Sequence, residues 1–491
     1  MKYFLSIFLL FFSAFLQAQP SVVWDSAKQS LENEIKNLPQ QKEWKIETVV
    51  IEGNKRTKKY IITRELLFNE GDWIHADELN ARLTIARLNV LNTQLFLEVI
   101  PSVNQQNDSS LVVKISVKER WYIFPIPYFK PIDRNANQWL VEQSASLERI
   151  NYGLKFKWEN VSGRRDKLRF NYVNGYTRQF LLSYEQPYAD KKLQHGYLAS
   201  ISYSRNRQLA FATDNNKQVF FPQGNNNITS LITTSFRAEA GYSYRPGVKE
   251  RHTFRIGYNV EKIPDTISVL IRDNYNKGFL PFFANNVSKQ TFGEFSYLYQ
   301  YFDVNNIVYP WKGIVFNMQF IQRGLGVKGM NLWQLKAKGG RFIEINNKTS
   351  FSVIGMGLLK LPFKQPMFNL QAHGYGDLYL RGLEYYVIDG VMAGIIKTTV
   401  RREIMEIKVP TLIIQNEKYK KIPFKIVGKA YADAGGVHLP FFTNSILNNR
   451  LLYTWGFGLD VLSYYDFAAC FEYSFNQLGE KGLFLHLRRD F

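Results

Sequence analysis

The stretch that decides the fold is LLYTWGFGLDV, residues 451–461. Every second residue in it is large and apolar, whereas the residues between are mostly small or polar. The segments 236–244 and 254–260 alternate in the same way. Successive side chains of a β-strand point to opposite faces, so each segment predicts a strand with one face suited to lipid and one suited to water. A charged or small second face would be a poor inner layer for a soluble sandwich.

This alternation extends over residues 121–491, a stretch of 371 residues. At roughly 20 to 25 residues per strand and connection, that length allows about 16 membrane strands. Backbone groups in lipid must all pair, so the strands are expected to close. We predict an all-β transmembrane barrel of about 16 antiparallel strands at 120–491. No apolar run past residue 18 reaches the roughly 18 to 20 residues of a spanning helix, which excludes helical membrane proteins.

The chain carries 62 basic and 42 acidic residues, a formal net charge of +20. This balance favours an anionic partner and is equally compatible with nucleic acid, anionic lipid or a basic channel lining. Cys470 is the single cysteine, which excludes an intramolecular disulfide and any cysteine-based zinc site.

Residues 1–18 have the pattern of a secretory signal peptide. Lys2 forms a positive n-region, Tyr3 to Phe15 are mostly apolar, and Ala18 precedes the expected cleavage point. No cysteine stands there, so lipoprotein processing is not expected. We interpret the polar residues 19–44 as a linker containing a short helix.

Residues 45–119 have a different character, because helical and strand periods follow one another. The pattern predicts a strand ending at Gly53, a helix capped by Thr57, a second helix from Asp77 and two final strands, 96–103 and 111–119. The second helix places four apolar residues on one stripe at spacings of 4, 3 and 4: Leu79, Leu83, Ala86 and Val90. A small α+β domain of β-α-α-β-β order is therefore expected before the barrel.

The module carries four short motifs in a fixed order: Ile51-Glu52-Gly53-Asn54, Arg64-Glu65-Leu66, Gly71-Asp72 and Leu95-Phe96. In these motifs it resembles a POTRA (polypeptide-transport-associated) domain. The resemblance implies that the domain captures extended client segments by adding them as a strand at a sheet edge. The expected client edge is the strand 96–103, with Phe96, Leu97 and Val99 as its contact residues.

Two further motifs lie in the predicted barrel: Leu380-Arg381-Gly382-Leu383 and Tyr431-Ala432-Asp433-Ala434-Gly435. They resemble motifs of the bacterial surface antigen superfamily of outer-membrane insertases and translocases. The first resembles a motif on a loop folded into the barrel lumen, and the second resembles the strand motif that receives its arginine. The resemblance implies a bidentate pair between Arg381 and Asp433, with Glu403 and Glu406 as alternative acceptors. Leu383 replaces the family's aromatic residue, and Tyr385 is the nearest substitute.

The last strand is expected to end the barrel at a seam with the first. Leu483, Leu485 and the terminal Phe491 share one face, which resembles the terminal signal of outer-membrane barrels. The first strand, 121–129, contains Pro125 and Pro127, which lack a backbone N–H. We predict that both missing donors face residues 482–491, where Ile126 would lie near Leu485. The resemblance implies that this seam opens laterally to a client.

No catalytic constellation is recognisable. There is no G-x-S-x-G, Walker or H-E-x-x-H motif, and the six histidines lack ligand spacing. We therefore expect no enzyme activity, no cofactor and no metal.

The predicted function is insertion of barrel proteins into the bacterial outer membrane, or translocation of polypeptides across it, with the POTRA domain in the periplasm. The alternative is a passive channel or surface receptor, which would not need residues 45–119. Expected partners are unfolded outer-membrane or secreted polypeptides, outer-membrane lipid, and periplasmic or lipoprotein assembly subunits. A nucleic-acid partner is not expected, because the signal sequence and the lipid-suited strand faces argue against one.

Overall fold

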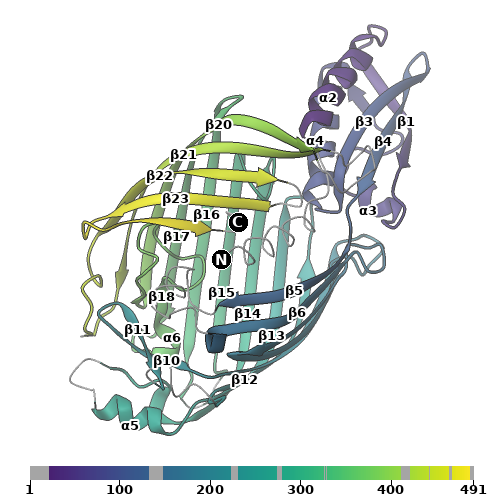
Figure 1. Cartoon of the computed structure of the whole chain (residues 1–491). Coiled ribbons are helices and arrows are strands. Elements are labelled where there is room, and N and C mark those ends of the chain that lie inside the picture. The colour runs from purple at the N-terminus through teal and green to yellow at the C-terminus, as the bar shows by residue number, and fades with distance from the viewer. Residues whose placement is uncertain are drawn as a thin grey trace.

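The computed structural model describes residues 21–131, 147–222, 230–273, 279–325, 327, 329–410, 421–441, 443–463 and 467–486. An N-terminal α+β domain lies against one end of a large curved sheet (Figure 1). Among these residues, none of the helices has the length and apolar character needed to cross a membrane. The predicted signal peptide, residues 1–18, lies outside the described residues.

The N-terminal domain contains the predicted elements and one additional strand. Its elements are α2 (Ser21–Lys36), β1 (Glu43–Glu52), α3 (Lys59–Thr63), β2 (Trp73–His75), α4 (Ala76–Asn92), β3 (Phe96–Asn107) and β4 (Ser110–Glu119). The sheet order is β2-β1-β4-β3, with β1 parallel to β4. Thr57 does not cap α3, because that helix starts after Lys58 and has no side-chain cap. The expected cap was therefore wrong.

The apolar stripe of α4 forms the centre of this domain. Leu79, Leu83, Ala86 and Val90 are all fully buried, as their spacing predicts. They pack in one cluster with inward residues of β1 and β4, such as Ile46. The predicted second helix and its core face are confirmed.

The segment 19–44 is not a simple linker. Helix α2 packs against β3, and its Leu31 is 1% exposed within the domain core. The segment looked like a linker because its apolar residues are few, yet a helix needs only one such face to dock.

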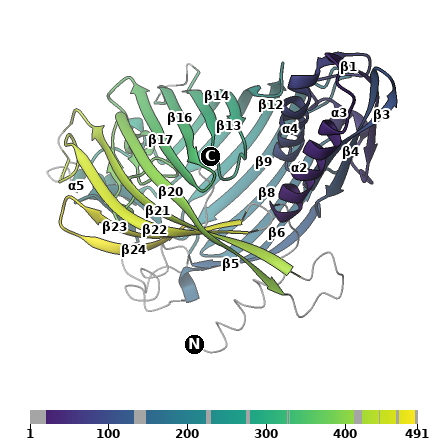
Figure 2. The same cartoon turned by 90° about the horizontal axis from the view of Figure 1, so that it is seen from above.

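The large sheet has 16 strands, all paired antiparallel in sequence order from β5 to β24. It curves into a barrel (Figure 2). The strands are β5 (Ile123–Pro131), β6 (Ile150–Glu159), β7 (Lys167–Gly175), β8 (Thr177–Gln186), β9 (His195–Asn206), β12 (Thr234–Tyr244), β13 (Glu250–Lys262), β14 (Lys289–Val304), β15 (Gly313–Arg323), β16 (Leu332–Asn346), β17 (Thr349–Leu361), β20 (Met392–Pro410), β21 (Lys421–His438), β22 (Leu452–Ser463), β23 (Phe467–Asn476) and β24 (Lys481–His486). The predicted fold class and strand number are confirmed.

The two faces of each strand differ as the alternation predicts. On β22, Tyr453 and Trp455 are more than half exposed on the outer face, where lipid would cover them. Between them, Thr454 faces inward and is 2% exposed. The inward residues of the whole sheet form the lumen.

We call the barrel end that meets the N-terminal domain proximal and the opposite end distal. The distal end carries β10 (Leu209–Asp214), β11 (Lys217–Phe221) and α5 (Thr266–Asp273), which pack on the short helix α6 (Met367–Leu370). The hairpin tip residue Asn216 is fully buried, and its side chain accepts the N–H groups of Ile446 and Leu447. We call this assembly the distal cap.

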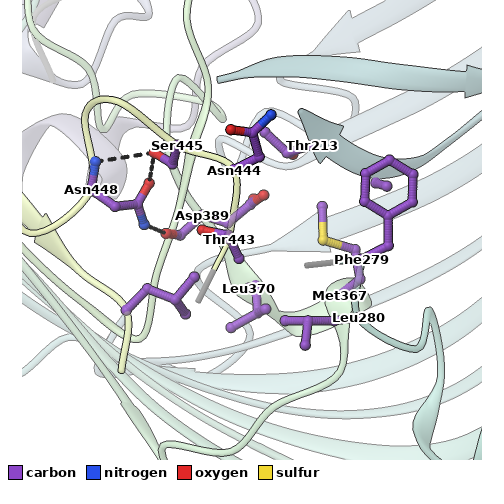
Figure 3. A pocket seen from close by; sticks show the side chains of 12 residues that line it. Thr213, Phe279, Leu280, Met367, Leu370, Asp389, Thr443, Asn444, Ser445 and Asn448 are labelled. Atoms are coloured by element: carbon purple, nitrogen blue, oxygen red, sulfur yellow. Dashed lines mark hydrogen bonds between the residues drawn. The ribbon is translucent and has the colours of Figure 1, made fainter. Parts of the chain in front are cut away.

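A small cavity lies inside the distal cap (Figure 3). Asp389, Ser445 and Asn448 line its polar side, and Phe279 and Met367 line its apolar side. Its volume of about 20 Å³ has room for about one water molecule. We therefore assign no ligand to it.

Candidate functional site: the lumenal loop, the seam and the domain junction

The first candidate motif lies on a loop inside the barrel. Residues 362–391 connect β17 to β20, and we call them the lumenal loop. The loop contains α6, β18 (Gln371–His373) and β19 (Ile388–Asp389), and β18, which pairs with β19, lies within the curve of the barrel (Figure 1). Asp377 of the loop pairs with Lys336 of β16. The loop therefore crosses the lumen from β16 toward the last strands.

Arg381 of the lumenal loop pairs with Asp433 of β21. The Arg381 Nε lies 2.8 Å from Asp433 Oδ2, and its Nη2 donates to the other carboxylate oxygen. Arg381 is 7% exposed and Asp433 is 3% exposed. A planar guanidinium fixes a carboxylate through two parallel bonds, and in a site shielded from water this pair is strong. The predicted pairing is confirmed, and the alternative acceptor Glu403 pairs with Lys425 instead.

The other motif residues support this pair. The Tyr431 ring lies 3.9 Å from the Arg381 guanidinium carbon, a cation–π contact. Gly382 has φ +91°, and a Cβ there would lie 2.8 Å from the Ser474 Cβ, so only glycine fits. Leu380 and Leu383 are fully buried in an apolar cluster.

Glycine is also needed within the strand motif. Gly435 ends the strand motif, and a Cβ there would lie 2.5 Å from the Gly394 carbonyl oxygen of the neighbouring strand. Tyr385 was expected to take the place of the family's aromatic motif residue. Its ring packs instead on Phe484 of β24, with 5.3 Å between the ring centroids.

Four further charged residues surround the pair, and motif reasoning missed them. Lys397 faces Asp433 across the β20–β21 ladder, and Lys429 bridges Asp460 and Glu472 at 2.6 Å each. All four are less than 10% exposed. All four side chains lie on the same inward face of the sheet as that of Asp433. The alternation of the strands could have identified them as lumenal from the sequence.

The last strand is tied to the same cluster. The His486 Nε2 of β24 lies 3.1 Å from Glu384 of the lumenal loop and 3.3 Å from Glu472. These are the three described residues whose candidate ligand atoms lie within 4.8 Å of one another. Their mutual ion pairs account for the arrangement, so we assign no metal.

The seam strands β5 and β24 are the two ends of the sheet and are not paired to each other in the part of the chain that the structure describes. The Glu159 N–H donates to the Tyr122 carbonyl just before β5 begins. In an antiparallel ladder, the backbone N–H and C=O groups of successive residues point to opposite edges of the strand. The backbone groups of even-numbered residues of β5 therefore point to β6. The missing N–H groups of Pro125 and Pro127 therefore fall on the seam side, as predicted.

One seam expectation was wrong. Ile126 lies opposite Lys155 on the lumenal face, whereas Leu485 is 58% exposed on the outer face. Their side chains therefore point to opposite sides of the sheet and cannot meet across the seam. The alternation within each strand shows which residues share a face. It does not show which face of β5 continues into which face of β24. Phe491 lies outside the described residues.

The expected client edge on β3 is occupied. The Val103 N–H donates to Glu34 of α2 at 3.0 Å, and the Val99 carbonyl accepts from Arg87 of α4 at 3.1 Å. Pro101, between them on the same edge, has no N–H. Covering an edge in this way prevents strand addition, so β3 is not a free edge here.

The side chains predicted to contact a client also lie elsewhere. Phe96, Leu97 and Val99 are each less than 5% exposed. Phe96 and Val99 belong to the domain core. Sequence patterning placed the strand correctly but could not show that two helices cover its outer edge.

The N-terminal domain is fixed to the barrel by a buried ion pair. Glu65, in the motif Arg64-Glu65-Leu66, is fully buried and accepts two bonds from Arg245 at 2.6 and 3.1 Å. Arg64 donates to the Leu193 carbonyl at 2.8 Å. Burial raises the pKa of Glu65. The positive charges of Arg245, Arg165 and Arg64 together lower it by more than burial raises it, so the pKa lies below its ordinary value.

A second contact joins the domain to the β6–β7 turn. The Asn160 amide donates to the Thr57 hydroxyl at 2.9 Å, and that hydroxyl lies 3.1 Å from the Tyr122 hydroxyl. Tyr122 in turn donates to the Leu95 carbonyl. The domain therefore lies against the proximal turns beside β8, β9 and β12 (Figure 2).

Two family models match the sequence. The POTRA model, described as a surface antigen variable number repeat, matches residues 44–120. The Omp85 superfamily domain matches residues 160–390. Among curated proteins, no match reaches significance.

Solved structures align with most of this chain. BamA from Haemophilus ducreyi, in a form lacking POTRA domains 1–3, aligns with 15% identity over 90% of this chain and 83% of that chain, with a TM-score of 0.48. CdiB from Escherichia coli aligns with 11% identity over 91% of this chain and 75% of that chain, with a TM-score of 0.50. At such identities the likeness concerns the fold alone.

Proposed function

The chain belongs to the Omp85 superfamily of outer-membrane barrel proteins, and from that premise we propose that it inserts barrel proteins into the outer membrane or passes polypeptides across it. The N-terminal domain lies in the periplasm, and the distal cap faces the cell exterior. The client leaves the lumen or the membrane boundary through the seam between β5 and β24.

The observation that carries this proposal is the proline-containing edge of β5. Three prolines of equal parity, Pro125, Pro127 and Pro131, leave the seam side with carbonyl acceptors and few donors. A sheet edge with few donors pairs weakly, because each missing ladder bond removes about 0.5 to 1.5 kcal/mol. A barrel that only conducts solutes gains nothing from a weak closure, whereas a barrel that admits a strand requires one.

The lumenal loop supports the same function. Through Arg381, it is fixed to β21, and through Glu384 it reaches His486 on the seam strand β24. The loop therefore holds the last strand in place from inside. Movement of this loop would break the contact between Glu384 and His486 and so weaken the hold on β24 at the seam.

Client capture involves the N-terminal domain and needs a rearrangement of α2. Strand addition at β3 requires Glu34 to release the Val103 N–H. Until that release, the covered edge protects the domain from pairing with unintended strands.

The passive-channel alternative is disfavoured by the distal cap. Its apolar cluster and the buried tip residue Asn216 join β10 and β11 to the lumenal loop and to residues 443–448. These contacts fill part of the distal end with packed side chains, which leaves less room for solutes there than an open channel would have. A direct comparison is to delete residues 45–119: a channel would keep its conductance, whereas an insertase or translocase would lose its activity.

Depletion of the protein in its native cell tests the proposal. Quantitative profiling of the outer membrane and of surface and secreted proteins should show the loss of a defined set. Loss of barrel proteins indicates insertion, and loss of surface or secreted proteins indicates translocation. Re-expression of the wild-type chain should restore the set, and re-expression of Arg381→Ala should not. An unchanged profile on full depletion contradicts the proposal.

A further inference from the structure

The turn between β14 and β15 folds back into the proximal mouth of the barrel. It comprises residues 305–312, and its Val308 and Tyr309 are each 7% exposed. Asn306 holds its shape, because its side-chain oxygen accepts the N–H groups of both residues at 2.7 and 3.2 Å. We call this segment the inserted turn. Its burial means that it contacts structure on more than one side.

One side of the inserted turn meets the N-terminal domain. Asn92, the last residue of α4, donates to the Val304 carbonyl at 3.1 Å and accepts the Ile307 N–H at 3.3 Å. The Asn92 side chain therefore binds both the residue before the turn, through its N–H, and a residue within the turn, through its oxygen. On this side, the hold on the turn therefore depends on the N-terminal domain being docked.

The other side of the inserted turn meets the lumen. The Tyr309 hydroxyl donates to Asp460 Oδ2 of β22 at 2.7 Å. The Arg401 guanidinium lies over the Tyr309 ring at 4.6 Å from its centroid. Ser350 also donates to the Trp311 carbonyl at 2.7 Å.

From Asp460, a continuous set of charged contacts leads to the site already described. Lys429 contacts Asp460 and Glu472, both at 2.6 Å. Glu472 lies 3.3 Å from His486 on the seam strand and 4.0 Å from Arg381 of the lumenal loop. All of these groups except His486, whose side chain is 14% exposed, are buried, so each depends on its neighbours for compensation.

We propose that Tyr309 is a positioning residue that couples docking of the N-terminal domain to the lumenal charge cluster, and through it to the lumenal loop and last strand. Undocking at Asn92 frees the inserted turn, which withdraws the Tyr309 hydroxyl from Asp460. The cluster then loses a partner and loosens its hold on β24. The use of this coupling in client delivery rests on the proposed function, but the coupling itself does not.

Cys470 provides a native reporter for this coupling. It lies opposite both Asp460 of β22 and His486 of β24, on the lumenal face, and is the only cysteine in the chain. Local opening increases the access of a thiol reagent to a partly buried cysteine, so the increase in labelling rate between variants reports how much more often the cluster opens. The measurement needs no client and no knowledge of the reaction.

The experiment compares Cys470 labelling by a maleimide in the full-length protein in detergent micelles. The variants are Asn92→Ala, Tyr309→Phe and the double variant, each normalised to the rate of its denatured chain. Loss of a buried hydrogen bond to a charged group corresponds to about tenfold or more in the opening equilibrium. We expect Tyr309→Phe to label about tenfold faster and Asn92→Ala, which loses two hydrogen bonds to neutral backbone groups, to label severalfold faster. The double variant should label no faster than the faster single one, because both act in series.

Two matched controls separate coupling from general loosening. Asn104→Ala alters an exposed asparagine of the same domain, and Tyr453→Phe removes a hydroxyl from the outer face of β22; both should label at the wild-type rate. Retention of the heat-sensitive gel mobility of a folded barrel identifies variants that fold. A wild-type labelling rate in Asn92→Ala, or additive effects in the double variant, would overturn the coupling without affecting the proposed function.

Discussion

Arg381 and Asp433, 52 residues apart in the sequence, form a bidentate ion pair inside the barrel, with the Tyr431 ring beneath the guanidinium. The pair fixes a loop of about 30 residues to one strand of the sheet. Glu472, which contacts His486 of the last strand, also lies 4.0 Å from the same arginine. The pair is therefore in contact with the residues that hold the last strand. The lumenal loop and the seam therefore form one connected unit.

Reversing the charge at one end of this pair should disable the protein. Arg381→Glu places a third carboxylate beside Asp433 and Glu472, and removing one partner of a buried pair costs about 3 to 5 kcal/mol. Growth complementation and protease sensitivity of the lumenal loop measure the loss. Arg381→Lys, which keeps the charge without the bidentate geometry, should be intermediate.

The double variant Arg381→Glu/Asp433→Arg should recover part of the function. Recovery is partial because the new carboxylate at 381 remains close to Glu472. A double variant no better than Arg381→Glu would show that the pairing is not what the loop depends on.

Cysteines placed on one face of the seam should form a disulfide, and cysteines on opposite faces should not. In a Cys470→Ser background, Ile126→Cys combined with Gly482→Cys or Phe484→Cys places both thiols toward the lumen. The matched control is Ile126→Cys with Leu485→Cys, whose side chains point to opposite faces. Non-reducing gels measure the yield. Equal yields from the control and from both lumenal pairs would contradict the assigned faces.

Restoring the missing donors should tighten the seam. Pro125→Ala/Pro127→Ala adds two N–H groups on the seam side of β5, each worth about 0.5 to 1.5 kcal/mol if it pairs. We expect a higher temperature for loss of the folded gel mobility, together with slower function. Pro101→Ala, on β3 of the N-terminal domain, is the control and should leave the barrel transition unchanged. An unchanged transition in the double variant would place the prolines away from the closing edge.

Docking of the N-terminal domain should depend on pH through Glu65. Its pKa in the docked protein is below the ordinary value of 4.5, so its contribution to docking is present above that value and is lost as pH falls through the lowered pKa. The protection factors of amides in the α3 region, which are exchange rates divided into the intrinsic rates at the same pH, should therefore be high at neutral pH and fall in acid.

Glu65→Gln should abolish most of this pH dependence, and Arg245→Ala should destabilise docking by about 3 to 5 kcal/mol by leaving a buried carboxylate uncompensated. The exposed pair of Glu78 and Arg82 is the control, since its removal should change exchange little. Identical exchange in Arg245→Ala and the wild-type chain would show that this pair does not hold the domain.

The sequence was sufficient to predict features that follow from strand parity or from motif order. Alternation placed Tyr453 and Trp455 outside and Thr454 inside, and the order of two motifs predicted the pairing of Arg381 with Asp433. Parity also set Pro125 and Pro127 on one edge, although only the ladder with β6 shows which edge that is.

Other features depend on contacts between distant segments and have no local signal. Lys429 and Glu472 have inward parity, but their pairing depends on the register of β21, β22 and β23. The covered edge at Val103 arises from Glu34 on a helix 69 residues earlier in the chain. The contact of Tyr309 with Asp460 spans 151 residues and requires a turn to fold into the barrel.

The most direct test of the central claim is insertion or translocation by the purified protein in liposomes, measured with the seam free and locked. Urea-unfolded outer-membrane barrels and secreted polypeptides identified by the depletion experiment serve as clients, and protease protection reports their arrival. The account predicts that wild type accelerates this step, that an oxidised lumenal seam disulfide stops it, and that reduction restores it. Full activity of the oxidised, locked barrel would contradict delivery through the seam.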